Sequence, residues 1–264
     1  MCLIVVALDC HPTYKLIVAA NRDEYFNRPT APAGLWDDAP QVLAGRDLQA
    51  GGTWLGVTTT GRLAAVTNYR DPTFQPPNPR SRGQLVADFL TGMTTPAEYL
   101  ETLRRDGAGY GGFNLLFGDR GRLFYFSNRG GVSGPVPPGI HGLSNHLLDT
   151  PWPKVQAAKD RLECLLDRNP PDTEALFEAL GDPHPFPDHL LPDTGVGIER
   201  ERLLSPLFIE GTDYGTRSST LVLIDRKNTL TFLERSYDSQ HGVNGNAAFS
   251  IVSGGIVSIG GDVP

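Results

Sequence analysis

Four pairs of apolar segments, each pair separated by a short polar turn, constrain the fold of this chain most strongly. The segments are rich in β-branched residues that favour extended strands, and the turns carry the glycine, aspartate and asparagine that tight reversals need. Each pair therefore predicts an antiparallel hairpin, and eight such strands predict one or two antiparallel sheets. The pairs are "CLIVVAL" with "KLIVAAN", "TWLGVT" with "RLAAVTN", "FNLLFG" with "RLFYFSN", and "STLVLID" with "TLTFLERS".

Helical patterns lie between the predicted hairpins rather than within them. The segment "TTPAEYLETLRRDG" combines helical apolar spacing with a threonine cap, Pro96 in the first turn and Gly107 after the end. Similar patterns occur in "SRGQLVADFLTG", "PWPKVQAAKDRLECLLD" and "PDTEALFEALG". Strand pairs interspersed with helix pairs favour an α+β fold whose helices cover the sheets. The proline-rich stretch 181–197 is aperiodic and predicts a long loop, which is often functional or mobile.

Length and charge limit the possible classes of protein. The 264 residues allow one or two domains, because sheet-rich chains of this length often form one domain with one large core. A hydrophobic content of 39% with 20% charged residues is ordinary for a globular protein and excludes disordered and fibrous classes. The net charge of −7 argues against nucleic acid or an anionic membrane as the main partner, so small neutral, cationic or mixed ligands are expected.

The cysteines and the first residues indicate a compartment. Cys2, Cys10 and Cys164 are too few and too scattered for a disulfide framework, and none has the paired spacing of a zinc site. The apolar run after Met1 ends at Leu8, lacks a basic segment, and is too short for a signal peptide or a membrane span. These features predict a cytoplasmic protein without a transmembrane segment.

The first hairpin would place Cys2 beside a cluster of polar residues. Antiparallel pairing around a turn at residues 9–13 sets Cys2 opposite Asn21 or Arg22, where the apolar second strand ends in "NRDE". An amide, a guanidinium and two carboxylates would then lie near the first thiol of the chain. The alternative is that residues 21–24 only end a strand and begin a solvated loop.

If Met1 is removed, Cys2 carries both a thiol and a free α-amine, and this pair can form a complete catalytic unit. The amine, with an ordinary pKa of about 8, can act as the base for its own thiol, so no histidine is needed. Arg22 would favour the thiolate, and Asp23 would hold and orient the ammonium. The alternative is that Cys2 is a small buried hydrophobe in an apolar strand.

Several strings, in order along nearly the whole chain, resemble one known family. The string "NRDEYFNRPTAP" after an N-terminal Met-Cys is followed by "GGTWLGVTTTGRLAAVTNYRD", "GLSNHLLDTPWPKV" and "YGTRSSTLVLID". These strings resemble the NRDE family, also called the transport and Golgi organisation protein 2 family, which is similar to the N-terminal-nucleophile (Ntn) hydrolases. The resemblance implies a single domain over residues 1–264 with a four-layer αββα sandwich, in which two antiparallel sheets are covered by helices.

The resemblance to cysteine members such as the choloylglycine and penicillin V amidohydrolases also implies a set of site residues. In those relatives other residues separate the arginine from the aspartate, whereas Arg22 and Asp23 are adjacent here, so their side chains can point in opposite directions. By this resemblance Cys2 is the nucleophile, Arg22 and Asp23 flank it, and Asn68, Asn145 and Arg217 complete the pocket.

Each of the last three residues also has a plainer local interpretation. The amide of Asn68, at a strand end, can donate to an oxyanion, which typically lowers a barrier by about 3 to 4 kcal/mol, or it can form a turn. Asn145 precedes a predicted helix, so capping is favoured slightly over catalysis, although both can hold together. Arg217 lies at a strand entrance, where it can bind a carboxylate, tune the thiolate or form a surface ion pair.

Glycines and histidines add two further expectations. Gly51 and Gly52 fit neither a phosphate loop nor a dinucleotide fingerprint and are interpreted as closely approached backbone that lines a pocket. The six histidines show no metal-ligand spacing, so no metal site is expected. His184 and His189 lie in the proline-rich loop, where the alternatives are an axial haem ligand and a solvated side chain.

Two functions of different classes follow from these observations. The first is an N-terminal cysteine hydrolase of non-peptide carbon–nitrogen bonds that acts on a linear amide or related acyl compound and requires no cofactor. The second is a non-catalytic trafficking protein that carries haem or a lipid-like acyl compound. The resemblance implies the second as much as the first, because family members are linked to haem mobilisation and lipid metabolism. For the carrier the pocket matters more than the thiol.

Overall fold

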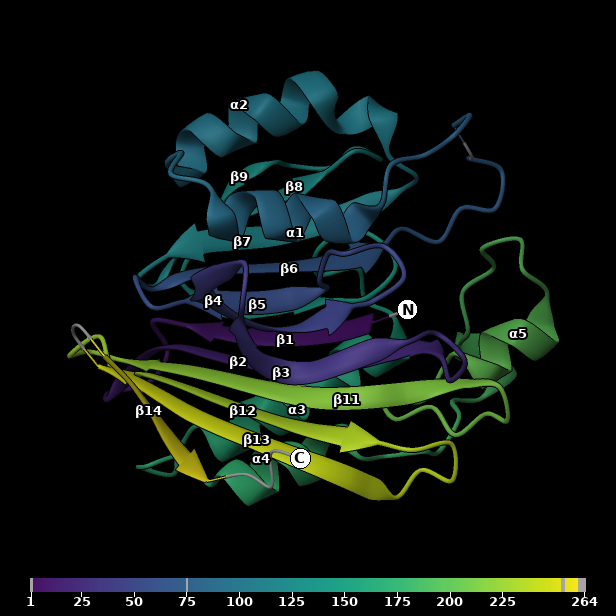
Figure 1. The fold of residues 1–264 in the computed structure, drawn as a ribbon. Helices are drawn as coiled ribbons and strands as arrows, with labels where there is room; N and C mark the ends of the chain where they lie inside the picture. The colour runs from purple at the N-terminus through teal and green to yellow at the C-terminus, as the bar shows by residue number, and fades with distance from the viewer. Residues whose placement is uncertain (1, 75, 253–254, 261–264) are drawn as a thin grey trace.

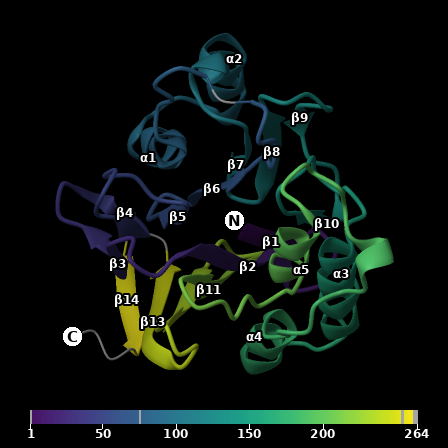
Figure 2. The same cartoon turned by 90° about the vertical axis from the view of Figure 1, so that its right-hand side faces the viewer.

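The strands form two antiparallel sheets that pack face to face, with helices on both outer faces (Figure 1). A computed structural model describes residues 2–74, 76–252 and 255–260. Within these residues each sheet has seven strands. Figure 2 shows the layers end on, with one helix pair on each side of the sheets. The predicted α+β class and the four-layer αββα sandwich are confirmed.

The first sheet contains the predicted first hairpin near its centre. Strand β1 is hydrogen-bonded to β2 on one side and to β10 on the other, so the beginning of the chain lies inside a sheet rather than at its edge. In spatial order the strands are β10 (Gly139–Leu143), β1 (Cys2–Leu8), β2 (Tyr14–Tyr25), β11 (Tyr214–Asp225), β12 (Leu230–Tyr237), β13 (Val243–Val252) and β14 (Gly255–Gly260).

The second sheet follows the order of the chain. Each strand pairs antiparallel with the next one along the sequence, and the long excursion between β6 and β7 supplies two helices. In spatial order the strands are β3 (Thr30–Trp36), β4 (Ala39–Asp47), β5 (Leu55–Thr58), β6 (Arg62–Asn68), β7 (Phe113–Asp119), β8 (Arg122–Ser127) and β9 (Gly134–Pro135).

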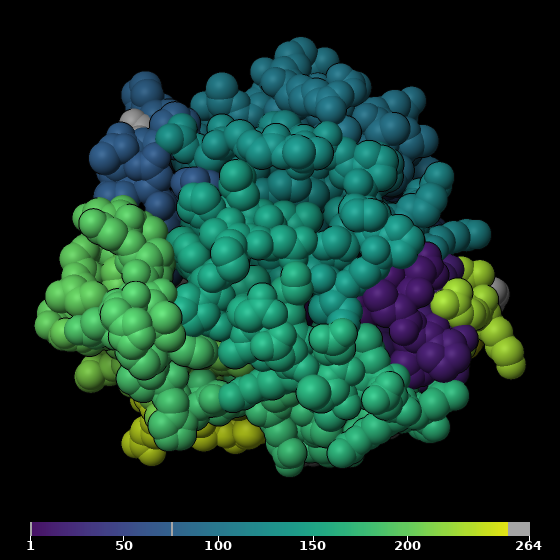
Figure 3. All heavy atoms as spheres, turned by 180° about the vertical axis from the view of Figure 1, so that it is seen from behind, coloured from purple at the N-terminus to yellow at the C-terminus, as the bar shows by residue number. Residues whose placement is uncertain are grey.

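Two helix pairs cover the outer faces of the sandwich. The first pair, α1 (Arg82–Thr91) and α2 (Pro96–Asp106), packs on the second sheet, and a 3-10 turn, η1 (Gly107–Gly109), follows it. The second pair, α3 (Pro153–Leu165) and α4 (Thr173–Leu180), packs on the first sheet. The segment after α4 contains the 3-10 turn η2 (Asp188–Leu190) and α5 (Ile198–Leu203), and it protrudes at one edge of the molecule in the space-filling view (Figure 3).

Both faces of β1 are buried, which explains its uninterrupted apolar sequence. Ile4, Val6 and Leu8 lie in the core between the sheets, whereas Leu3 and Val5 lie in the core between the first sheet and its helices. Such double burial removes the polar alternation of a half-exposed strand. The same alternation continues along β2, and it decides which polar side chains at the strand end face the second sheet.

The predicted hairpins and helices are confirmed, and the sequence patterns missed several further strands. The four expected pairs are β1 with β2, β5 with β6, β7 with β8, and β11 with β12. The expected cap at Thr95 forms a capping box with Glu98. Strand β3 was not predicted because Pro32 and Gly34 interrupt it, and its pairing with β4 is shifted between Ala31 and Gly34.

No helix within the described part of the chain is long and apolar enough to cross a membrane. The predicted domain boundary at residue 264 lies outside the described residues, as does Met1.

Candidate active site

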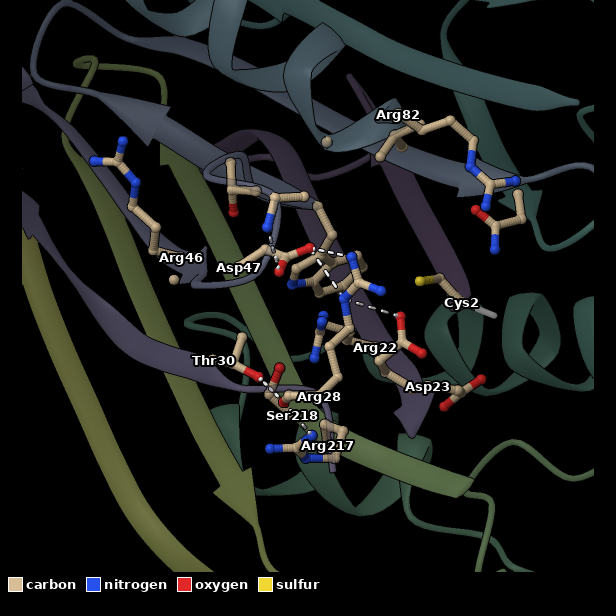
Figure 4. Close-up of a pocket in the computed structure, with 18 of the residues that line it drawn as sticks. Cys2, Arg22, Asp23, Arg28, Thr30, Arg46, Asp47, Arg82, Arg217 and Ser218 are labelled. Carbon is tan, nitrogen blue, oxygen red and sulfur yellow. Dashed lines mark hydrogen bonds and ion pairs between the residues drawn. The ribbon is translucent and has the colours of Figure 1, made fainter. Parts of the chain in front are cut away.

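A pocket of about 790 Å³ lies between the two sheets at the end where β1 begins (Figure 4). Its lining combines strands of the first sheet, strands of the second sheet and the first turn of α1. Of the predicted site residues, the pocket brings together Cys2, Arg22, Asp23, Asn68 and Arg217. The sixth, Asn145, is not among the described residues that line it.

The register of the first hairpin places Cys2 directly opposite Arg22. This is one of the two pairings that the sequence predicts. Cys2 continues the face of β1 that carries Ile4 and Val6, and this face is turned toward the second sheet. The thiol therefore points into the pocket, as Figure 4 shows, although only 7% of the residue is exposed.

Arg22 and Asp23 leave β2 on opposite faces. Arg22 has the parity of Val18 and Ala20, which face the second sheet, whereas Asp23 has the parity of Ala19, which faces the helices. This alternation agrees with the opposite directions expected for adjacent residues in a strand. The guanidinium thus shares the pocket face with the thiol, and the carboxylate approaches the beginning of β1 from behind.

Asp23 is held in a buried polar environment. Only 1% of it is exposed, and its Oδ1 accepts a hydrogen bond of 2.8 Å from the Thr216 hydroxyl on the neighbouring strand. Burial raises the pKa of the Asp23 carboxyl, and the ammonium of Lys154 on α3 opposes that rise. The ammonium of Lys154, in the helix layer, therefore favours the ionised form of the Asp23 carboxyl.

The thiol itself is held in its neutral form by its surroundings. Burial raises the pKa of Cys2, and the Asp23 carboxylate adds to this rise while the Arg22 guanidinium opposes it. A neutral thiol at rest needs a base to become a nucleophile. An α-amine on the same residue would be the nearest possible base.

Asn68 and Asn145 are connected, but only Asn68 reaches the pocket. Asn145 is fully buried, and its Nδ2 donates to the Asn68 carbonyl over 2.9 Å. The neighbouring Ser144 hydroxyl donates to the Cys2 carbonyl over 3.1 Å. The favoured capping role for Asn145 is wrong, because α3 begins at Pro153 with Trp152 as its N-cap residue. Through this hydrogen bond Asn145 instead connects the segment after β10 to the end of β6.

Arg217 lines the pocket from a bulge in β11. The pairing with β2 shifts between Thr216 and Ser218, which sets Arg217 outside the regular ladder. Its Nη1 donates to the carbonyls of Tyr25 (2.8 Å) and Arg28 (3.2 Å). The alternative of a surface ion pair is therefore not observed, and the guanidinium holds the turn that follows β2.

The site also contains charged residues that the sequence motifs did not indicate. Arg82 is the first residue of α1, lines the pocket and donates from Nη1 to the Gly112 carbonyl over 3.2 Å. Lys154 is 3% exposed and donates from Nζ to the Leu204 carbonyl over 3.0 Å. Burial lowers the pKa of Lys154 to about 8, and Asp23 opposes this effect. Neither residue lies near Cys2 in sequence, so local patterns carry no signal for them.

The glycine and histidine expectations are only partly met. Gly52 is closely approached, since a Cβ there would lie 2.5 Å from the Gly83 carbonyl carbon, but its neighbour is the first turn of α1 and it is not in the pocket lining. His184 and His189 lie in the exposed loop away from the pocket, and no described lining residue is a histidine. The described residues also contain no cluster of three or more side chains suited to a metal ion.

Comparison with known proteins gives matches over most of the chain. A profile of the family Transport and Golgi organisation 2 matches residues 1–239. The Transport and Golgi organization 2 homolog of Mus musculus is 36% identical over 257 residues, which covers 89% of this chain and 93% of that protein. The Bos taurus homolog is 38% identical over 257 residues, with the same coverage of 89% and 93%.

Solved structures with a comparable fold match this chain at low sequence identity. The C2A mutant of conjugated bile acid hydrolase from Clostridium perfringens superimposes with a TM-score of 0.50 and 10% identity, covering 98% of this chain and 97% of that one. At this identity the likeness concerns the fold alone.

Proposed function

The chain belongs to the Transport and Golgi organisation 2 family, and we propose that it is an N-terminal cysteine hydrolase that cleaves carbon–nitrogen bonds in linear amides or related acyl compounds. The observation that carries the proposal is the thiol of Cys2, which opens into the pocket opposite Arg22 with Asp23 behind it. The chemistry requires that Met1 is removed, so that Cys2 bears the free α-amine.

The reaction begins with proton transfer within one residue. The α-amine takes the proton of the Cys2 thiol, and the thiolate attacks the amide carbonyl to give a tetrahedral intermediate. Arg22 stabilises the thiolate as it forms, and Asp23 stabilises the ammonium. Because burial raises the pKa of the thiol, the proton transfer depends on the Arg22 cation, which favours the thiolate.

The intermediate collapses when the leaving amine receives the same proton. The negative oxygen of the intermediate accepts hydrogen bonds from donors at the pocket wall, and the amide of Asn68 serves as one of them. Breakage of the carbon–nitrogen bond releases the amine and leaves a thioester on Cys2. Water, deprotonated by the α-amine, then hydrolyses the thioester and restores the thiol.

The first test is chemical labelling of Cys2. Cys10 and Cys164 are exposed, so both are first replaced by serine to leave Cys2 as the sole thiol. Intact mass of this variant should show loss of Met1 and a single adduct with a cysteine-directed acylating probe, and the added Cys2→Ala change should remove the adduct. Absence of an adduct, with Met1 confirmed absent, contradicts the proposal.

A carrier function for haem or an acyl compound is the second candidate, supported by the volume of the pocket between the sheets. Titration with hemin, followed by the Soret band, tests the haem version. The described lining contains neither histidine nor methionine, so a shifted Soret band would need Cys2, Tyr69 or Tyr237 as ligand. A flat titration removes haem as a cargo.

A further inference from the structure

The acidic side chains that line the pocket have partners within the protein, whereas several of its guanidiniums have no acidic partner in the described part of the chain. Every acidic side chain in its described lining has a protein partner. Glu24 and Asp47 pair with Arg28, Asp71 pairs with Arg129, Asp23 accepts from Thr216, and Glu234 accepts from the Ala33 amide and the Thr220 hydroxyl. The acids are thus satisfied within the protein.

Several guanidiniums of the same lining have no acidic partner among the described residues. Arg82 and Arg217 donate only to backbone carbonyls, and Arg80 stacks over the Tyr110 ring. Arg22 makes neither an ion pair nor a side-chain hydrogen bond with any described residue, although only 8% of it is exposed. Buried donors in proteins are nearly always paired, and an unpaired buried charge is costly. The pocket therefore offers guanidiniums that no described carboxylate contacts directly, although Glu24 and Glu234 act on them at longer range.

Two of these guanidiniums approach the thiol from opposite layers. Arg22 extends from β2 in the first sheet, and Arg82 extends from the first turn of α1 above the second sheet (Figure 4). Both interact electrostatically with the position of the Cys2 sulfur. Since burial favours the neutral thiol, neither guanidinium has the resting sulfur as its counterion.

We propose that Arg22 and Arg82 bind a carboxylate of the ligand next to Cys2, so that the preferred substrates are N-acyl amino acids rather than neutral N-acyl amines. Guanidiniums bind carboxylates through paired hydrogen bonds. Because both flank the nucleophile, the carboxylate must lie within a few bonds of the scissile carbonyl, as it does in an N-acyl α-amino acid. The choice of amides rests on the proposed function, whereas the anion site does not.

This local charge reverses the expectation from composition. A net charge of −7 favours neutral, cationic or mixed ligands. The acidic residues responsible for it lie elsewhere or are already paired in the pocket, so the total charge of the chain does not describe the field at the site.

The test compares two ligands that differ only in charge. N-lauroylglycine and N-lauroylethanolamine share the acyl chain and the amide, and they differ by a carboxylate in place of a hydroxymethyl group. Their affinities are measured by calorimetry with the Cys2→Ser variant, in which a much weaker nucleophile slows acylation. We expect the glycine compound to bind at least about tenfold more tightly, and Arg82→Gln to reduce this ratio about tenfold.

Arg46→Gln is the matched control, and thermal unfolding shows whether each variant is folded. Arg46 also lines the pocket, but it pairs with Asp38 and stacks over Trp36, so its loss should leave the ratio unchanged. Arg82→Lys, which retains the charge, should recover part of the preference. Equal affinities for the two compounds, or a preference that survives Arg82→Gln in a folded protein, overturn the inference.

Turnover by the wild-type protein separates this inference from the proposed function. If neither amide is cleaved while the Cys2→Ser variant still prefers the glycine compound, the hydrolase proposal fails and the anion site stands. If both amides are cleaved but bound equally, the hydrolase stands and the anion site is refuted.

Discussion

Cys2 and Arg22 face each other across the pairing of β1 with β2, and both side chains lie on the sheet face that borders the pocket. Asp23, the next residue, lies on the other face behind them. One strand end thus supplies a cation on the thiol side and an anion on the helix side. The two charges act on the Cys2 thiol in opposite directions, since Asp23 raises its pKa and Arg22 lowers it.

Replacement of Cys2 by alanine should abolish hydrolysis with little effect on folding. The substitution removes one sulfur atom that borders the pocket, so the free energy of unfolding should change by less than about 1 kcal/mol. Turnover and urea denaturation of the same sample check both parts. Retained turnover in Cys2→Ala would exclude the thiol as nucleophile.

The pH dependence of alkylation should report the two charges beside the thiol with opposite signs. The rate at which Cys2 reacts with iodoacetamide is measured as a function of pH in the Cys10→Ser, Cys164→Ser background. The midpoint of this profile should lie above the ordinary thiol pKa of 9.0, because burial raises the pKa of this thiol. Arg22→Met removes a cation and should move the midpoint up. Asp23→Asn removes an anion and should move it down. Midpoints that shift in the same direction would contradict the geometry.

The two asparagines should respond differently to truncation. Asn68→Ala should lower kcat about 100-fold to 1,000-fold with little change in stability, if its amide serves the oxyanion. Asn145→Ala leaves the partly buried Asn68 carbonyl without its side-chain donor and should cost about 1 to 3 kcal/mol of unfolding free energy. Steady-state kinetics and denaturation of each variant make the comparison. Equal losses of stability would place both amides in structural roles.

Lys154 should make stability rise with pH in the alkaline range. Its pKa falls from the ordinary 10.5 to about 8 on folding, so between these values the unfolded chain binds more protons than the folded one. The free energy of unfolding therefore gains a contribution that increases from about pH 8 upward. Lys154→Met should lack this rise, because the group that binds the extra proton in the unfolded chain is gone.

Urea unfolding at several pH values between about 7 and 10 measures this behaviour. Lys159→Met is a suitable control, since Lys159 lies on the same helix but is partly exposed and pairs with Asp149. The control should keep the alkaline rise. A slope between about pH 8 and 10 that is the same in the wild type and in Lys154→Met would show that Lys154 keeps an ordinary pKa.

The strands that form the floor of the site were predictable, and the charges that surround them were not. Continuous apolar runs identify β1 and β2, and the short turn between them fixes the register to within one residue, which is enough to set Cys2 against Arg22. Arg82 and Lys154 reach the site only because helices on both sides of the sandwich begin beside it. Their positions depend on the packing of whole layers, which no local spacing encodes.

The error at Asn145 has a related cause. Its sequence context suits a helix cap, but residues 146–152 form turns before α3 begins, and the side chain turns inward to the end of β6. A contact between residues 77 positions apart in sequence decided its role.

The place of β1 between β10 and β2 in the first sheet has a consequence for biosynthesis. This strand is the first to leave the ribosome, yet one of its neighbours is β10 at residues 139–143, and β2 must wait for β11 at residues 214–225. Pairing over such separations is slow to form. The beginning of β1 therefore stays unpaired with β10 until residue 143 has been translated, which leaves time for the removal of Met1 that the proposed function requires.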